Sequence, residues 1–274
     1  MKSLGPGRSL NLGSPVNWAD PLNRGLVAWW LALPNYKGLQ WRNLTSSGLY
    51  HGTLTNGPVW QGSKGRPGGF GSLKFDATDD LVDCGQAIGN GVTTNFTTGA
   101  WIRPSSLASQ QNVVQRRASG PGWAFDLLTS GVMRFTVVGV ANYDTTATVP
   151  TNSWTRVDAV YTSGAGLIYI NGVQALSVAM GSITNTTGES YVIGKRQYSG
   201  TSDRVFNGNI DDVSFFNRAL SASDIYQRYA ASKAGYPTQL NWNRRAYGYV
   251  AALGGTVFNP LTGRGGAAAQ PVAA

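Results

Sequence analysis

The acidic residues that could hydrolyse a glycosidic bond are few in this chain and poorly spaced for it. A retaining glycosidase needs two carboxylates about 5–5.5 Å apart, one as nucleophile and one as acid. The chain has a single glutamate, Glu189, in the turn-like context Thr-Gly-Glu-Ser. Its closest acidic pair, Asp211-Asp212, is adjacent, so in a strand the two side chains are predicted to face opposite sides of the sheet. The acidic run 76–83 is interpreted as turn-capping and solvated carboxylates.

Other catalytic arrangements are also missing from the sequence. The sole histidine, His51, precedes Gly52 and is interpreted as a packing or hydrogen-bonding residue; no Ser-His-Asp arrangement can be built on it. Cys84 is the only cysteine, which excludes an internal disulfide and predicts a buried core thiol. The glycines at 68–71 lack the lysine and helix that follow a phosphate-binding loop. The sequence therefore predicts that the protein is not an enzyme.

The composition favours many short strands joined by turns. Of 274 residues, 42% are hydrophobic, 13% are charged, 36 are glycine and 12 are proline. No run approaches the ~18 consecutive apolar residues of a membrane-spanning helix. Residues 1–7 include a lysine but lack the apolar core of a secretory signal. We therefore predict an all-β chain with no membrane partner.

The net charge of +9 comes from 22 lysines and arginines against 13 acids. Such a surface attracts nucleic acid, anionic glycans or an acidic protein. The basic residues are scattered as doublets at 116–117, 195–196 and 244–245, without a basic helix, a zinc finger or an aromatic RNA-binding signature. We expect no specific nucleic-acid partner.

Two local signals predict a hairpin turn and the start of a helix. Asn171-Gly172 follows the apolar run 167–170, and this pair suits the two positive φ values of a type I′ hairpin turn. Ser221 with Asp224 forms an acidic variant of the capping box after a strand around 210–215, which predicts a helix over 222–233. The runs 123–127 and 133–137 alternate in character, as half-buried strands do.

Several motifs occur in the order seen in one family. They are Gly-Leu-Val-Ala-Trp-Trp at 25–30, His-Gly-Thr-Leu at 51–54, Gly-Pro-Val-Trp at 57–60, Gly-Ser-Leu-Lys-Phe-Asp at 71–76, Phe-Thr-Thr-Gly-Ala-Trp-Ile-Arg-Pro at 96–104 and Asn-Gly-Asn-Ile-Asp-Asp-Val at 207–213. From about residue 22 to 229 the chain resembles laminin-G-like domains of the concanavalin A-like lectin/glucanase superfamily. The resemblance implies an all-β fold, a jelly-roll β-sandwich of two antiparallel sheets with one short C-terminal helix. We place this single domain at residues 21–235, between extended arms at 1–20 and 236–274.

The resemblance also bears on metal binding and catalysis. Relatives of this kind hold Ca²⁺ through Asp and Asn side chains, which makes Asp211 and Asn43 the candidate ligands here. Asn43 stands where those relatives carry an Asp, and the loss of one carboxylate weakens a site for a hard cation. We therefore expect no cofactor, with Ca²⁺ as the one alternative. Glucanases of the superfamily carry their carboxylates as glutamates on one strand, a pattern that this chain lacks.

Glycan recognition needs exposed aromatic rings beside hydrogen-bonding side chains, although surface aromatics serve protein contacts as often. The loop candidates for a sugar platform are Trp123, Tyr143 and Tyr198, with the basic residues Arg116, Arg117 and Arg196 near them in sequence.

The two arms have a different composition, irregular and rich in Gly and Pro, and the second mixes aromatics with arginines. Residues suited to a partner surface are Trp242, Arg244, Arg245, Tyr247 and Tyr249. We predict a non-enzymatic structural or decoration protein of a large assembly, such as a phage-like virion, whose domain binds surface glycans. Its partners would be other protein subunits, with homo-oligomerisation, at a virion surface or another extracellular assembly. The alternatives are a free-standing carbohydrate-binding or adhesion module and, remotely, a polysaccharide-active enzyme.

Overall fold

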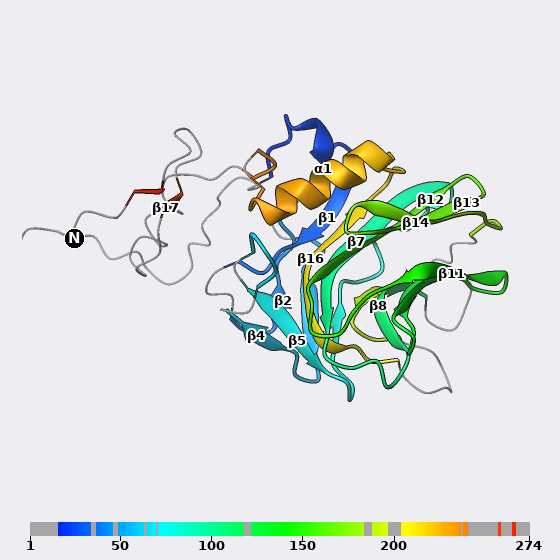
Figure 1. Ribbon diagram of the computed structural model, residues 1–274, viewed down its shortest axis with the longest axis horizontal. Helices are drawn as coiled ribbons and strands as arrows, with labels where there is room; N and C mark the ends of the chain where they lie inside the picture. The colour runs from blue at the N-terminus through cyan, green and yellow to red at the C-terminus, as the bar shows by residue number, and fades with distance from the viewer. Residues whose placement is uncertain are drawn as a thin grey trace, which may run out of the picture.

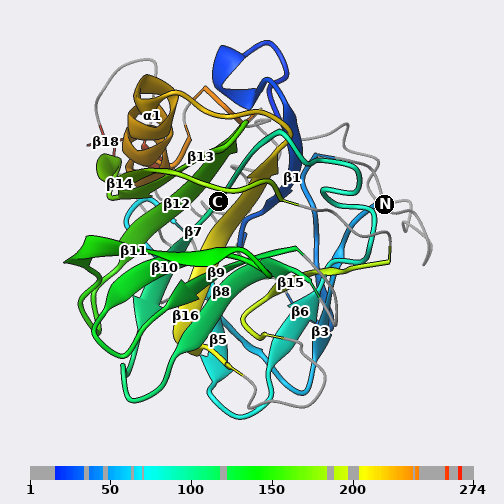
Figure 2. The same cartoon turned by 90° about the vertical axis from the view of Figure 1, so that its right-hand side faces the viewer.

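The computed structural model describes residues 16–33, 37–45, 49–62, 65–69, 71–117, 122–183, 188–196, 204–236 and 238–240, and the backbone of two short strands, β17 (Val257–Phe258) and β18 (Gly265–Gly266). Two antiparallel sheets face each other, as the all-β prediction requires (Figures 1 and 2). We name them the β16 sheet and the β8 sheet after a central strand of each.

The β16 sheet has, in order across it, β14 (Val173–Ala179), β13 (Ala165–Ile170), β12 (Thr155–Thr162), β7 (Asn95–Pro104), β16 (Asn207–Phe216), β5 (Ser72–Asp76) and β4 (Val59–Gln61), and β1 (Leu26–Trp30) also pairs with β16. The β8 sheet has the order β11 (Ala141–Thr148), β10 (Val132–Val137), β9 (Trp123–Leu127), β8 (Gln111–Arg116), β15 (Tyr191–Ile193), β6 (Leu81–Asp83), β3 (Gly52–Thr55) and β2 (Gln40–Trp41). A short 3-10 helix, η1 (Pro21–Asn23), precedes β1.

The predicted hairpin and capped helix are both confirmed. Asn171 and Gly172 have φ values of 51° and 78°, so they form the left-handed turn that joins β13 to β14. Helix α1 (Ala222–Lys233) begins with a full capping box: Ser221 Oγ accepts from Asp224 N, and Asp224 Oδ2 accepts from Ser221 N. No helix among the described residues is long and apolar enough to cross a membrane.

Helix α1 covers the outer face of the β16 sheet (Figure 1). Trp101 of β7 donates from Nε1 to Ser232 Oγ at 3.0 Å and stacks on Tyr229, both on the helix. Arg228 of the helix lies over the ring of Trp29, 5.2 Å from its centroid. The part of this outer face that lies under helix α1, around Trp29 and Trp101, is therefore buried.

Aromatic rings fill the space between the sheets. Phe96 stacks on Trp123 at 4.9 Å and on Phe215 at 5.7 Å, and Tyr161 lies 5.7 Å away. The prediction that 123–127 is half-buried is wrong, because every residue of β9 is buried. Its outward side chain Asp126 is covered by Arg204, from a segment that returns to the sheet after β15.

The inner ends of the two predicted arms pack on the sandwich. Val16 forms an isolated bridge with Leu240, and the carbonyl of Gln239 accepts from the N–H of Asn17 at 2.8 Å. Val16 and Tyr236 are both about 1% exposed. The compact body thus includes residues 16–20, 236 and 238–240.

Candidate functional site

The adjacent pair Asp211 and Asp212 lies on one side of the β16 sheet, and the prediction that the two side chains point apart is wrong. The register of β16 against β7 shifts between Asp211 and Ser214, and Asp212 has a φ of 56°. This bulge turns the second carboxylate to the side of the first. Arg66 Nε lies 3.2 Å from Oδ2 of both aspartates, and all three side chains are at most 1% exposed.

Further buried groups donate hydrogen bonds within this charged cluster. Arg156 donates from Nη2 to Asp158 Oδ1 at 2.6 Å and from Nη1 to the Asp212 carbonyl at 2.8 Å. Trp29 Nε1 donates to Asp212 Oδ1 at 2.7 Å. Burial raises the pKa of Asp211, and the charge of Arg66 opposes that rise. Because helix α1 and Tyr236 cover the cluster, it is a structural core and not a substrate site.

The two predicted calcium ligands do not fit a metal ion. Asn43 Oδ1 accepts from the backbone N–H of Trp29 at 2.9 Å and from that of Thr45 at 3.1 Å. Asp211 Oδ1 accepts from the N–H of Ala32 at 2.8 Å, while Oδ2 faces Arg66. A hard cation needs several such oxygens at once. The positive charge beside Asp211 is supplied by the protein's own guanidinium.

Three of the six predicted ligand-binding residues are buried, namely Trp123, Arg116 and Arg117, and the first two lie inside the protein, which corrects those assignments. Trp123 is 2% exposed and stacks in the core, so it cannot offer a ring to a sugar. Arg116 is 1% exposed and donates from Nε to the carbonyl of Ile88 at 2.9 Å. Tyr143 is half-buried, and its hydroxyl accepts from the N–H of Gly181. Tyr198 lies outside the described residues.

The other two, Arg117 and Arg196, line one cavity of about 560 Å³ at the edge of the β8 sheet. Arg204 joins them, and the turn from β10 to β11 forms the opposite wall. Thr136 and Asn142 add polar side chains, and Thr136 Oγ1 donates to Asn142 Oδ1 at 2.8 Å. Arg117 is buried at 4% exposure and lies far in sequence from Arg196 and Arg204, and all three residues line this cavity.

Asp126, beneath the cavity, fixes the position of Arg204. Arg204 Nη1 lies 2.8 Å from Asp126 Oδ2, and Asn112 donates to Asp126 Oδ1 at 2.8 Å. Burial raises the pKa of Asp126, against the opposing effects of Asn112 and Arg204. Burial also lowers the pKa of Arg204, and the neighbouring charges of Arg196 and Arg134 lower it further. Positive charge is therefore crowded at this end of the sheet.

Arg204 and Asp126 belong to this site but were not predicted from the sequence. They are 78 residues apart, and the segment that carries Arg204 becomes a neighbour of β8 only through its backbone bond to Asn112. The alternation of β9 is a signal for Asp126. Because Phe125 and Leu127 face the core, the side chain between them points to the outer face of the sheet.

A second cavity of about 560 Å³ lies beside the edge strand β4. It is lined by Trp60, Gln61, Ser72 and Lys37, and Trp60 Nε1 donates to the Gly38 carbonyl at 2.9 Å. The ring of Trp60 is half-buried and packs edge-on against Trp41. This cavity has an aromatic wall but a single cationic side chain among its described lining residues.

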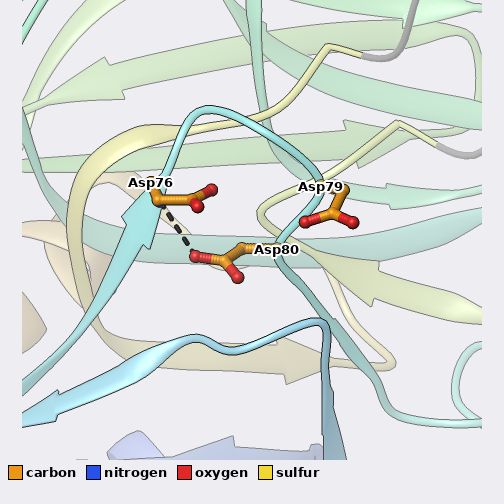
Figure 3. Close-up of side chains that lie close together, drawn as sticks. All are labelled: Asp76, Asp79 and Asp80. Atoms are coloured by element: carbon orange, nitrogen blue, oxygen red, sulfur yellow. Dashed lines mark hydrogen bonds between the residues drawn. The ribbon is translucent and has the colours of Figure 1, made fainter.

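Three carboxylates gather in the turn between β5 and β6, where the sequence predicted solvated, turn-capping aspartates (Figure 3). One oxygen from each of Asp76, Asp79 and Asp80 lies within 4.8 Å of the others. Asp80 Oδ2 accepts from Asp76 N at 2.9 Å, and Asp76 Oδ1 accepts from Thr78 N at 2.8 Å, so the turn-capping role is confirmed. Asp80 itself is 2% exposed and not solvated.

The acidity of Asp80 predicts a pH-dependent contribution to stability. Burial, with the charges of Asp76 and Asp79, raises the pKa of Asp80 to about 6 from an ordinary value of 3.8. A raised carboxyl pKa stabilises the fold below pH 3.8, and that contribution is lost as the pH rises through about 6. Asp80→Asn is therefore expected to be more stable than the native protein at pH 8 by about 1 kcal/mol, after allowance for screening by water around Asp76. The gain should vanish near pH 4 in urea titrations; an equal gain at both pH values would contradict this assignment.

The other residues named from the sequence are Cys84, His51 and the proposed assembly contacts. Cys84 is a buried core thiol, as predicted, and His51 is a hydrogen-bonding residue whose Nδ1 accepts from the N–H of Asn43 at 3.0 Å. The proposed assembly contacts lie outside the described residues; they are Trp242, Arg244, Arg245, Tyr247 and Tyr249.

Comparison with solved structures places this architecture among known sandwiches. A mutant of Trypanosoma rangeli sialidase displaying trans-sialidase activity is similar with a TM-score of 0.60 and 14% identity, over 77% of this chain and 34% of the sialidase. Domain 4 of AbnA, a GH43 extracellular arabinanase from Geobacillus stearothermophilus, in complex with arabinotriose, is similar with a TM-score of 0.55 and 18% identity. The similarity covers 74% of this chain and 97% of that domain. Botulinum neurotoxin type C, whose cell entry depends on interaction with two ganglioside molecules, is similar with a TM-score of 0.58 and 14% identity. The similarity covers 77% of this chain and 52% of the neurotoxin chain.

At these identities the likeness shows the fold alone, and the chain spans about a third of the length of the sialidases it matches. No curated protein matches the chain in sequence. A family profile, however, matches residues 76–226, which is more than half of the chain. The matched stretch runs from the end of β5 into helix α1 and so contains the central strands of both sheets. The chain therefore belongs to the concanavalin A-like lectin/glucanases superfamily.

Proposed function

We propose that the sandwich is a non-catalytic carbohydrate-binding domain and that the cavity lined by Arg117, Arg196 and Arg204 is its binding site. The observation that carries this proposal is the cavity itself, a sugar-sized, open space beside a sheet, bordered by hydroxyl, amide and guanidinium groups. Similar folds occur in proteins whose structures hold arabinotriose or concern ganglioside interaction, which adds general support.

The chemistry of the lining supports binding over hydrolysis. Glycosidic cleavage by the usual route needs two carboxyl groups flanking the bond. Neither cavity has an Asp or Glu among its described lining residues. The buried pair Asp211 and Asp212 is occupied by Arg66. Release of free sugar from any bound glycan would favour the enzyme alternative instead.

Filling the cavity tests its role. Ala141, at the exposed start of β11, lines the cavity, so Ala141→Trp is expected to abolish glycan binding on an array and in calorimetric titration. Ala147 is exposed on the same strand but does not line the cavity, so Ala147→Trp is the matched control and should bind normally. Equal binding by both variants would show that the glycan binds elsewhere, and the cavity lined by Trp60 would then be tested.

An assembly role is our second proposal, and the pairing of Val16 with Leu240 supports it. Because Val16 pairs with Leu240, segments 1–15 and 241–274 start from one place on the body and are suited to act as a joint anchor. A virion location, homo-oligomerisation and glycan-mediated attachment remain predictions from the sequence.

Removal of residues 1–15 and 241–274 is expected to leave a folded monomer that no longer joins its assembly. The buried contacts of Val16, Tyr236 and Leu240 stay intact in this truncation, so the body should fold. Mass in solution by light scattering checks this prediction. A full-length chain and a truncated chain that are both monomeric would contradict the anchoring role.

A further inference from the structure

We infer that Asp76, Asp79 and Asp80, in the turn between β5 and β6, form a binding site for a calcium ion. This site is separate from both cavities and from Asn43 and Asp211, and it does not depend on the proposed carbohydrate binding. The inference follows from the spacing of the three carboxylates, from one buried oxygen that lacks a donor, and from the charge of the surroundings.

The spacing of the three carboxylates fits a single calcium ion. One oxygen from each lies within 4.8 Å of the others, and Figure 3 shows the carboxylates of Asp76 and Asp79 facing each other across the turn with that of Asp80 beside them. Calcium binds oxygens at about 2.3–2.6 Å, so two ligands of one ion can be about 5 Å apart. All three carboxylates can therefore contact one ion with little movement of their side chains.

The buried carboxylate of Asp80 is a second observation that points to a ligand. Asp80 is 2% exposed, and its Oδ2 accepts from Asp76 N at 2.9 Å. Its Oδ1 is also buried, yet it accepts no hydrogen bond from any residue that the structure describes. A buried carboxylate oxygen without a partner is unfavourable. A cation held by the three aspartates would supply that partner.

No basic side chain of the described residues neutralises this cluster. Among them, no lysine, arginine or histidine forms an ion pair with Asp76, Asp79 or Asp80. This is notable in a chain with 22 basic and 13 acidic residues. Three carboxylates gathered in one turn repel one another, because like charges disfavour each other's ionised form. A divalent cation would offset most of that repulsion.

The position of the turn suggests what the ion would do. Strand β5 belongs to the β16 sheet and β6 to the β8 sheet, so the turn connects the two sheets. Asn56, in the turn from β3 to β4, donates from Nδ2 to the Asp79 carbonyl at 3.2 Å, and this second turn connects the same two sheets. Because Asp76 is exposed, an ion can enter from solvent and keep water among its ligands. We therefore expect bound calcium to stabilise the fold.

Calorimetric titration of the full-length protein with CaCl₂ tests the site, at about 0.15 M NaCl so that distant charges are screened. We expect a dissociation constant on the order of 10⁻⁴–10⁻³ M, in the weaker range of protein calcium sites. Calcium at about 10 mM should then raise the midpoint of thermal unfolding by about 3–10 °C. Magnesium should have a smaller effect, because it gives up its water reluctantly and demands closer ligands.

Asp79→Asn is the most direct variant. Among the described residues, the Asp79 side chain makes no hydrogen bond, so this variant should fold normally and bind calcium at least about tenfold more weakly. Asp83→Asn is the matched control, because it removes the same charge nearby. Asp83 lies outside the cluster, and its Oδ1 accepts from the N–H of Gly85, so the control should bind calcium normally.

Asp80→Asn gives an independent readout. The stability that this variant is expected to gain at pH 8 applies to the protein without calcium. Added calcium should remove that advantage, because the substitution takes away a charged ligand.

Each contrary result overturns the inference. Absence of calcium binding up to about 10 mM would exclude the site. An equal loss of affinity in Asp79→Asn and Asp83→Asn would attribute binding to net charge, and full binding by Asp79→Asn would show that the ion lies elsewhere. Equal stabilisation by magnesium would exclude a calcium site. If Asp80→Asn kept its advantage in calcium, Asp80 would not be a ligand.

Discussion

Arg66→Met is expected to lower the free energy of unfolding by about 3–5 kcal/mol, among the largest losses for any single substitution in this protein. The guanidinium of Arg66 lies 3.2 Å from one oxygen each of Asp211 and Asp212, and none of these side chains is more than 1% exposed. Arg66 also donates to the carbonyl of Ser232 at the end of helix α1. Methionine fills a similar volume but leaves the buried Asp211 without this cation, beside Asp212, which keeps only Arg156 at 3.7 Å.

Urea unfolding at neutral pH measures this loss. Arg134→Met is the matched control, because Arg134 pairs with Asp144 through two bonds of 2.6 Å while both side chains are partly exposed. Such a surface pair contributes about 0–1 kcal/mol. Adding Asp211→Asn to Arg66→Met should recover part of the loss, because it removes the carboxylate that has lost its cation. A loss below about 1 kcal/mol for Arg66→Met would show that the buried carboxylates do not depend on Arg66.

Trp123→Ala is expected to cost about 3–5 kcal/mol, as a large-to-small change at the centre of the core. The ring of Trp123 is 2% exposed and stacks on Phe96 at 4.9 Å, with Tyr191 at 6.0 Å and Phe215 at 6.5 Å. The cavity left behind is surrounded by rigid rings that cannot collapse into it. Any loss of glycan binding in this variant should follow the loss of folded protein.

The exposed tryptophan Trp18 offers the control of the same type. It is 52% exposed, so Trp18→Ala should change the stability by no more than about 0.5 kcal/mol. Thermal and urea unfolding of both variants, with binding measured at temperatures where each is folded, separates the two roles. A stable Trp123→Ala that selectively lost binding would restore Trp123 as a ligand residue and contradict its place in the core.

The fold was largely predictable from local sequence. Asn171-Gly172 specified its hairpin because a type I′ turn depends on the φ preferences of those two residues alone. Ser221 and Asp224 specified the start of helix α1 because a capping box closes within four residues. Strands in between follow from alternation and from the ordered motifs that resemble the superfamily, and the profile match over 76–226 agrees with them.

The candidate site could be predicted only in part. Arg117 and Arg196 were named from their charge and do line one cavity. Arg116 was named for its charge and Trp123 as a loop aromatic, yet both are buried, because local sequence does not show that Trp123 faces the space between the sheets or that Arg116 reaches the carbonyl of Ile88. Local sequence also does not show that the outer face of β9 is covered by the segment with Arg204, which pairs with Asp126 across 78 positions of sequence.

By itself, then, the sequence determined the Asn-Gly turn, the helix start, the motifs that resemble the family and the identity of the charged residues, all of which depend on neighbours a few positions away. Only the tertiary structure decided which of those charges meet. The bulge in β16 places Asp211 and Asp212 on one side, and Arg66 reaches them across more than 140 residues. Such pairings are set by sheet register and by the path of connecting segments, and these depend on the packing of the whole chain.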